Sequence, residues 1–195
     1  MIIIEKLTKK HQNDIAEISA NCFLNDEYFD FLSKNKQEKK EKLKEMYLGA
    51  YNIAEQTGEC FGAFINNELV GYVIVLDYDT LQSNPQIYNE VFDTSKSEFG
   101  SDVHQFVKYA NGLKNAKYIL SVCVDPKHQK KGIGFQLIEH ITKQYKTGHI
   151  ISDVDNKNSL SIYKRLGFNI KTISDKFYII HKDLTKSLET ENAIK

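Results

Sequence analysis

The stretch HQKKGIG (His128–Gly134) lies between an apolar run and a segment with helical spacing. The run before it, YILSVCVD (Tyr118–Asp125), has the length and the β-branched content of a buried strand. The segment after it, FQLIEHITKQY (Phe135–Tyr145), spaces its apolar residues as an amphipathic helix does. The two glycines therefore fall in a tight turn that leads from a strand into a helix.

A glycine-rich turn of this kind is suited to bind an anion such as a phosphate, because its backbone N–H groups form a row and the helix N-terminus adds partial positive charge. Gly132 and Gly134 let a ligand approach the backbone without a Cβ in the way, and Lys130 and Lys131 add positive charge. Two common phosphate motifs do not fit. A P-loop ends in Gly-Lys-Ser/Thr, and a dinucleotide fingerprint needs a third glycine where Leu137 stands.

Strands and helices alternate along the rest of the chain, whose 195 residues are enough for one domain with a sizeable core. The patterns predict strands at residues 1–7, 59–65, 69–78, 117–125, 148–154, 168–173 and 176–184. They predict helices at residues 8–23, 33–56, 103–113, 132–146 and 158–167. Asn66 and Asn67 mark the clearest hairpin turn. The segment from Thr80 to Lys117 gives the weakest signal.

Composition argues against several classes of protein. The 26 Lys and Arg residues balance 26 Asp and Glu residues, so no nucleic-acid or anionic-membrane partner is expected. Cys22, Cys60 and Cys123 are far apart in the sequence and odd in number, so neither a metal site nor a disulfide framework is expected. The N-terminus has too short an apolar run for a signal peptide, and no run approaches the ~20 residues of a membrane span. A reduced, cytoplasmic protein is the expectation.

Two motifs in the second half resemble those of the GCN5-related N-acetyltransferase (GNAT) family. QKKGIG (129–134), after a strand that ends in Val-Asp-Pro, resembles that family's acetyl-CoA pyrophosphate loop. NKNSLSIYKRLGF (156–168) resembles the family's second signature. The positions at the family's spacing are Asn156, Ser159, Tyr163, Gly167 and Phe168. The core of the resemblance covers residues 117–168, and the order of elements extends it over 1–183.

The resemblance implies an α/β fold. Its central sheet would be mixed and mostly antiparallel, with about seven strands, helices on both faces and a splay between the fourth and fifth strands. It also implies a single acetyltransferase domain at 1–183, followed by a C-terminal tail at 184–195. A homodimer is compatible with the sequence.

The resemblance further implies acetyl-CoA as co-substrate. The backbone of 129–134 would hold the pyrophosphate, and the backbone of 122–124 would bind pantetheine and polarise the thioester carbonyl. Tyr163 would donate a proton to the leaving thiolate as general acid. The implied cofactor-binding residues are Val122, Cys123, Val124, Gln129, Lys130, Lys131, Gly132, Ile133, Gly134, Asn156, Ser159 and Tyr163. No metal is expected.

Each side-chain role has a structural alternative. Tyr163 is also compatible with an ordinary half-buried helix tyrosine, Asn156 with a helix N-cap, and Ser159 with close packing. Cys123 invites the hypothesis of a nucleophile, but no His or acid stands within three residues before it. A strand cysteine usually behaves as a small hydrophobic residue. Direct attack by the amine in a ternary complex is therefore preferred to an acyl-cysteine.

The sequence leaves the general base open. Many family members place a glutamate on the strand before the loop, and KYILSVC (117–123) has no carboxylate. The candidates are a water chain, Asp153, Asp155, Glu98, Asp102 and His104.

The acceptor is open as well. Acidic residues within 77–115 could attract a cationic amine such as a polyamine or an aminoglycoside, but acids scattered over a solvated loop are the preferred explanation. The expected function is acetyl transfer to a primary amine, with a small-molecule acceptor. The alternatives are a CoA-binding regulatory protein or pseudoenzyme, and a protein or peptide N-acetyltransferase.

Overall fold

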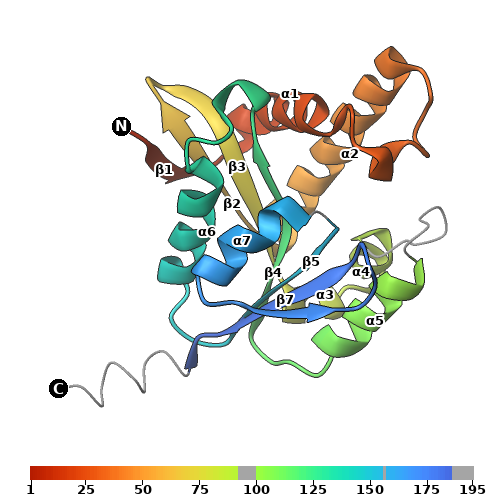
Figure 1. Cartoon of the computed structure of the whole chain (residues 1–195), viewed down its shortest axis with the longest axis vertical. Helices are drawn as coiled ribbons and strands as arrows, with labels where there is room; N and C mark the ends of the chain where they lie inside the picture. Colours follow the sequence, from red (N-terminus) through yellow and green to blue (C-terminus); the bar gives the residue numbers. More distant parts are fainter. Residues whose placement is uncertain (92–99, 156, 186–195) are drawn as a thin grey trace. The chain divides into compact units, whose positions relative to one another are not determined.

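The computed structural model describes residues 1–91, 100–155 and 157–185 (Figure 1). Its strands form a seven-stranded sheet in the order β1-β2-β3-β4-β5-β7-β6. The pairs β1–β2, β5–β7 and β6–β7 are antiparallel, whereas β4–β5 is parallel. Helices flank the sheet. The predicted mixed, mostly antiparallel α/β fold is thus confirmed.

The bounds of the elements agree with the predicted ranges to within a few residues outside the segment 80–117. The strands are β1 (Ile3–Lys6), β2 (Gly58–Ile65), β3 (Glu68–Asp77), β4 (Ala116–Val124), β5 (His149–Val154), β6 (Asn169–Thr172) and β7 (Tyr178–Asp183). The helices are α1 (Gln12–Phe23), α2 (Lys36–Thr57), α3 (Tyr78–Gln82), α4 (Pro85–Val91), α5 (Gly100–Ala110), α6 (Ile133–Gln144) and α7 (Lys157–Arg165). Short 3-10 turns are η1 (Lys9–His11), η2 (Glu27–Phe29) and η3 (Pro126–His128).

Two of these α-helices were not predicted. The helices α3 and α4 have five and seven residues, which is too few for a helical period to stand out in the sequence. Asp77 begins α3, since its carboxylate accepts the N–H of Thr80 at 2.8 Å. The predicted hairpin turn is confirmed, with φ values of 50° at Asn66 and 65° at Asn67.

The chain divides into two compact units. Unit 1 comprises Met1–Val75 and Ser121–Leu137, and unit 2 comprises Leu76–Leu120 and Ile138–Lys195. The boundaries between them fall inside β3, β4 and α6 in the sequence. The single acetyltransferase domain expected over 1–183 stays a prediction, and the tail from 186 onward lies outside the described residues.

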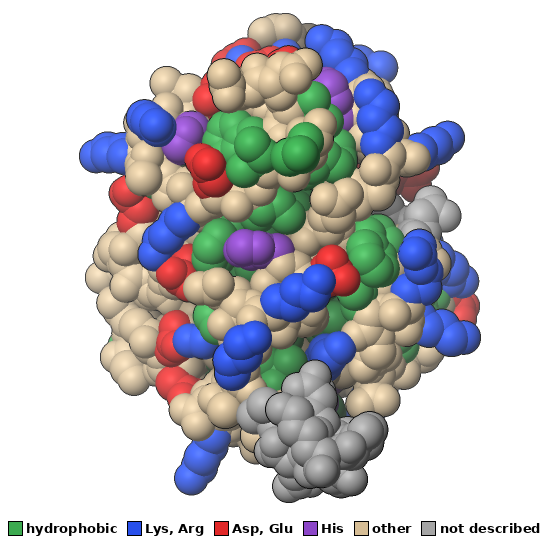
Figure 2. Space-filling view, turned by 90° about the vertical axis from the view of Figure 1, so that its left-hand side faces the viewer, with side chains coloured by type: hydrophobic (Ala, Val, Ile, Leu, Met, Phe, Trp, Pro, Cys, Tyr) green, Lys and Arg blue, Asp and Glu red, His purple; other side chains and the backbone are tan. Residues whose placement is uncertain are grey.

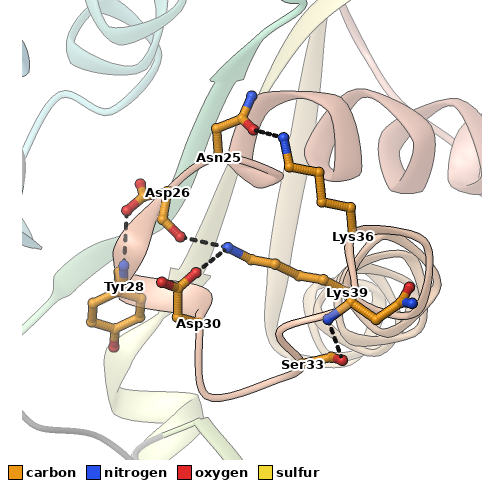
Figure 3. A network of polar contacts seen from close by, with 8 residues as sticks. Asn25, Asp26, Tyr28, Asp30, Ser33, Lys36 and Lys39 are labelled. Atoms are coloured by element: carbon orange, nitrogen blue, oxygen red, sulfur yellow. Dashed lines mark hydrogen bonds and ion pairs between the residues drawn. The ribbon is translucent and has the colours of Figure 1, made fainter.

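In unit 1, α1 packs against α2, and α2 against β2. The connection between the two helices is held by Lys39, which is only 4% exposed. Its ammonium group donates to Asp30 Oδ1 at 2.8 Å and to the carbonyl oxygen of Asp26 at 2.7 Å (Figure 3). A buried ammonium is tolerated only with such partners. Lys39 therefore fixes the loop that precedes α2.

In unit 2, both α5 and α7 contact β5. β5 pairs with β7 over its whole length, from His149 to Val154. Its parallel ladder with β4 is shorter and covers three pairs, from Ala116–His149 to Tyr118–Ile151. Both strands continue beyond the last pair, as the predicted splay between the fourth and fifth strands requires.

Charged side chains of both signs are interspersed over the face drawn in Figure 2. This distribution agrees with the balanced composition. Among the residues described, no helix combines the length and the apolar character needed to cross a lipid bilayer.

Candidate active site

The chain leaves β4 through a braced turn in unit 1. The backbone N–H of Asp125 donates to the carbonyl oxygen of Val70 on β3 at 2.9 Å. The Asp125 carboxylate accepts the N–H of Lys127 at 2.8 Å, and its carbonyl oxygen accepts the N–H of His128 at 2.7 Å. These bonds give the turn after β4 a fixed direction.

The loop that follows has the backbone geometry of an anion cradle. Lys130 and Gly132 both adopt left-handed conformations, with φ values of 61° and 78°. A Cβ at Gly132 would meet no atom within 4 Å, so open space lies over this backbone. The first turn of α6 leaves the N–H groups of Ile133 and Gly134 without partners inside the helix. Such groups at a helix N-terminus suit a pyrophosphate.

The loop side chains lie mostly outside this cradle. Gln129 turns back and donates from Nε2 to the carbonyl oxygen of Val124 at 3.1 Å. Lys130 and Lys131 are exposed, and Lys131 Nζ lies 3.3 Å from the carbonyl oxygen of Lys127. Ile133 is 2% exposed and packs in the core. An anion at this loop would therefore be bound mainly by backbone N–H groups, with the charges of Lys130 and Lys131 nearby.

The three strand residues before the turn differ in exposure. Val122 and Val124 are half-buried, whereas Cys123 is 1% exposed. Burial raises the pKa of the Cys123 thiol well above its usual value. A thiol that stays protonated is a poor nucleophile, which favours a backbone role for this residue.

Cys22, near the end of α1, lies with its Sγ 3.5 Å from the carbonyl oxygen of Val124 at the end of β4. This contact depends on the packing of α1 and was not evident in the sequence. All three cysteines are free thiols.

Tyr163 lies in unit 2, on α7, and is 4% exposed. Its ring packs edge-on against Phe168 with a centroid distance of 5.4 Å. Within the described ranges, no residue hydrogen-bonds to its hydroxyl group. Two effects raise the pKa of Tyr163 well above its usual value: burial is the larger, and the nearby charge of Asp153 is the smaller. The phenol therefore remains protonated at neutral pH and can serve as a proton donor.

Asp153 is the titratable group that stands out beside Tyr163. Burial raises the pKa of this carboxyl group, although a hydrogen bond from Tyr118 opposes the shift. Tyr118 Oη donates to Asp153 Oδ1 at 2.7 Å, and the Tyr118 ring packs against Phe106 at a centroid distance of 5.2 Å. A half-buried carboxylate with a raised pKa has the character of a general base.

The other candidates for the base are less suitable. The Asp102 carboxylate accepts a hydrogen bond from Ser174 Oγ at 2.8 Å and so supports structure. His104 and Asp155 are exposed. Glu98 is not among the residues described.

Two members of the second motif give limited information. Asn156 lies outside the described residues, so its predicted role in cofactor binding stays a prediction. Ser159 lies on α7 four residues before Tyr163, which places both on one face of the helix. Its predicted cofactor contact also stays a prediction.

Acidic residues of the segment 77–115 take part in local structure. The Asp77 carboxylate pairs with Lys117, and Asp79 Oδ2 accepts the N–H of Asn115 at 3.0 Å. Neither therefore acts as a free acid available to attract a cationic acceptor. Over 1–91, 100–155 and 157–185, no three His, Cys, Asp or Glu side chains are grouped so as to hold a metal ion.

Comparison with curated proteins and with solved structures adds three relatives. The ribosomal protein bS18-alanine N-acetyltransferase of Salmonella typhimurium is 29% identical over 65 residues, which are 31% of this chain and 44% of that enzyme. The chain thus matches less than half of that relative's length. A polyamine N-acetyltransferase of Drosophila melanogaster superposes with a TM-score of 0.61 at 12% identity, covering 94% of this chain and 100% of that one. The PaiA N-acetyltransferase of Thermoplasma acidophilum, solved with coenzyme A, superposes with a TM-score of 0.57 at 18% identity, covering 94% of this chain and 99% of that one.

The two solved structures share the fold at low identity. The family model described as the acetyltransferase (GNAT) family matches residues 21–168, which includes β4, the loop, α6 and α7. This match covers most of the chain and both motifs. The chain belongs to the GNAT family of acetyltransferases.

Proposed function

We propose that this protein transfers an acetyl group from acetyl-CoA to a primary amine by direct attack in a ternary complex. The observation that carries the proposal is the loop after β4. Its two left-handed residues, Lys130 and Gly132, precede the N-terminus of α6 and leave backbone amides for a pyrophosphate. The PaiA relative was solved with coenzyme A, which supports the same ligand here.

The strand before the loop would hold the pantetheine arm. Backbone N–H and C=O groups of residues 122–124 would pair with the arm as a neighbouring strand does. A backbone N–H in this strand would polarise the thioester carbonyl and stabilise the oxyanion that forms on attack. This role requires no nucleophilic side chain, in agreement with the protonated state of the buried Cys123 thiol.

Asp153 would act as the general base. An amine is mostly protonated at neutral pH and attacks a thioester only after losing that proton. The pKa of Asp153 is raised and so lies closer to neutral pH, and a general base is most effective when its pKa is near the working pH. Tyr118, through its hydrogen bond to Oδ1, would hold the carboxylate in position.

Tyr163 would act as the general acid. When the C–S bond breaks, the electron pair stays on sulfur and the thiolate needs a proton. The Tyr163 hydroxyl is protonated at neutral pH and can supply it. The nearby charge of Asp153 contributes to keeping that proton in place before the reaction.

We infer that the acceptor is a small amine. The Drosophila relative is a polyamine N-acetyltransferase that forms N-acetylagmatine, which supports this class. The Salmonella relative acetylates the alanine of a ribosomal protein, so a peptide α-amine is the second candidate.

A panel of acceptors tests the function. Purified protein is incubated with acetyl-CoA and either polyamines, agmatine, aromatic amines or a peptide that begins with alanine. Free CoA is followed by a thiol reagent, and the acetylated product by mass spectrometry. Turnover on a small amine is the expected result. Turnover on the peptide alone would favour the second candidate. CoA binding without turnover on any acceptor would indicate a regulatory protein.

A further inference from the structure

The C-terminus of α7, in unit 2, ends in a hydrogen-bonded cap that includes Tyr163. The backbone N–H of Phe168 donates to the carbonyl oxygen of Tyr163 at 3.0 Å, and the N–H of Gly167 donates to that of Lys164 at 3.1 Å. Gly167 has a φ of 75°. These two bonds around a left-handed glycine form a Schellman motif. The backbone of Tyr163 is therefore part of the cap.

The side chains of the cap are connected as well. The ring of Phe168 is 5% exposed and packs against the ring of Tyr163 at an interplanar angle of 79°. An apolar contact between these two positions often accompanies a Schellman motif. The Tyr163 hydroxyl has no hydrogen-bond partner within the described ranges. Ring packing and the end of the helix, rather than a hydrogen bond of its own, therefore fix where this hydroxyl lies.

Lys182 contacts the cap from β7. Its ammonium group donates to the carbonyl oxygen of Leu166, the residue before Gly167. The same Nζ lies 5.7 Å from the centroid of the Phe168 ring. A Cβ built on Gly167 would lie 3.5 Å from Nζ, which places the ammonium beside the turn itself. A cation at this end of a helix satisfies a carbonyl oxygen that lacks an intrahelical partner and opposes the negative end of the helix dipole.

The position of Lys182 is costly for a cation. The side chain is half-buried, and burial lowers the pKa of its ammonium group. Lys143 on α6 offers a contrast, because its side chain is 69% exposed and pairs with Glu139. A partly buried ammonium needs compensating partners. For Lys182 these are the Leu166 carbonyl oxygen and the face of the Phe168 ring, and both belong to the cap of α7.

We propose that Lys182 is a positioning residue for the general acid: it fixes the C-terminal cap of α7 and, through the cap, the hydroxyl of Tyr163. The inference rests on the proposed function, because acetyl transfer is the reaction that would use this hydroxyl. Without the ammonium, the Leu166 carbonyl would lose its donor and the Phe168 ring its cation. A displacement of about 1 Å in a reacting group can cost about 100-fold in rate.

The first measurement concerns the cap and involves neither cofactor nor turnover. Lys182→Met keeps an unbranched stem of similar length, removes the ammonium and leaves no buried charge behind, so the protein should fold. Hydrogen exchange followed by NMR should show faster exchange of the Gly167 and Phe168 amides than in the wild type. Lys143→Met is the matched control and should leave both rates unchanged. Unchanged rates in Lys182→Met would overturn the proposal.

A double-mutant cycle with Tyr163 tests the effect on the reaction. Lys182→Met should lower kcat by about 10-fold to 100-fold and leave the affinity for acetyl-CoA little changed. In a Tyr163→Phe background the same substitution should lower kcat no further, because no hydroxyl remains to be positioned. An equal fall in both backgrounds would show that Lys182 supports the structure alone, and the proposal would be wrong.

The conservative variant Lys182→Arg supplies a further check. Arginine keeps the charge and can donate to the Leu166 carbonyl, so kcat should lie closer to the wild type than to Lys182→Met. An equal loss in both variants would contradict the proposal. If the wild type neither binds nor consumes acetyl-CoA, the proposed function fails and the positioning role fails with it. The exchange rates of Gly167 and Phe168 would then still decide whether Lys182 holds the cap.

Discussion

The hydroxyl of Tyr118 donates a hydrogen bond of 2.7 Å to Oδ1 of Asp153. Both residues belong to unit 2, Tyr118 on β4 and Asp153 on β5. The bond favours the ionised carboxylate, whereas burial favours the neutral acid and prevails, so the pKa of Asp153 is raised. This balance between burial and hydrogen bonding is the reason why we propose Asp153 as the general base.

Asp153→Asn should reduce turnover by about 10²–10⁴-fold, because the amide has a similar shape but cannot accept the proton. In the wild type, kcat/KM should rise with pH as Asp153 ionises. Because the pKa of Asp153 is raised, this acid limb of the pH–rate profile should lie at a higher pH than an ordinary aspartate would give. The measurement is a pH–rate profile of both proteins. A variant that retains full turnover would exclude Asp153 as the base.

The same substitution should not destabilise the fold at neutral pH. A raised pKa means that the native state loses stability as the pH rises through that pKa, since the buried group must ionise. Asn stays neutral at every pH and still accepts the hydrogen bond from Tyr118. The urea midpoint of Asp153→Asn should therefore equal or exceed that of the wild type at pH 7. A much lower midpoint would mean that the loss of turnover is structural.

Tyr118→Phe tests the positioning role. Removing the hydroxyl removes the interaction that lowers the pKa of Asp153, so the acid limb of the pH–rate profile should move to higher pH. Turnover well above that limb should fall less than in Asp153→Asn, because the carboxylate is still present. An unshifted limb would show that Tyr118 does not tune the base.

Tyr163→Phe should reduce turnover by about 10²–10⁴-fold with little change in acetyl-CoA affinity, because only the proton donor is lost. The hydroxyl has no hydrogen-bond partner within the described ranges, so the fold should keep its stability. Steady-state kinetics and calorimetric titration of acetyl-CoA distinguish the two effects. Normal turnover would show that Tyr163 is structural or that water protonates the thiolate.

The direct-attack mechanism predicts no acetylated enzyme. The Cys123 thiol stays protonated, so acetyl-CoA without an amine should leave the protein mass unchanged. Intact-mass spectrometry checks this expectation under reducing conditions. A stoichiometric gain of about 42 Da that disappears when the amine is added would indicate an acyl-cysteine and ping-pong kinetics.

Lys39→Met should lower the free energy of unfolding by about 1–2 kcal/mol. The charged hydrogen bond to the Asp26 carbonyl is lost, while Asp30 is exposed enough to be solvated again. Lys36→Met is the matched control, since the Lys36 ammonium makes an exposed bond of 3.3 Å to Asn25 (Figure 3). It should change stability by no more than about 0.5 kcal/mol. Equal urea midpoints for the two variants would contradict this account of Lys39.

Local signals in the sequence were enough to predict the turn after β4 and most of the sheet. Gly132 and Gly134 between a strand and a helix predict the turn after β4, and Asn66 with Asn67 predicts the hairpin. These features depend on residues close together in the chain. The helices α3 and α4 were missed because they are too short to show a period.

Contacts between residues that are distant in the chain could not be predicted from the sequence. The hydrogen bond from Tyr118 to Asp153 depends on register, since Tyr118 pairs with Ile151 and Asp153 follows two residues later on the same face. Nothing in either segment alone fixes that register. The contact of Cys22 Sγ with the carbonyl oxygen of Val124 depends on how α1 packs, which the sequence does not reveal.

The most direct test of the account is calorimetric titration of acetyl-CoA into the wild type, Gly132→Val and Gly49→Ala. The valine at 132 must adopt a φ near 78° and fills the open space over the loop, so both the backbone geometry and the cradle are lost. Gly49 lies within α2, where a Cβ meets no atom within 4 Å, so its alanine variant controls for glycine replacement. We predict that the wild type and Gly49→Ala bind acetyl-CoA alike and that folded Gly132→Val does not bind it. Equal affinity in all three proteins would contradict the assignment of residues 129–134 as the acetyl-CoA site.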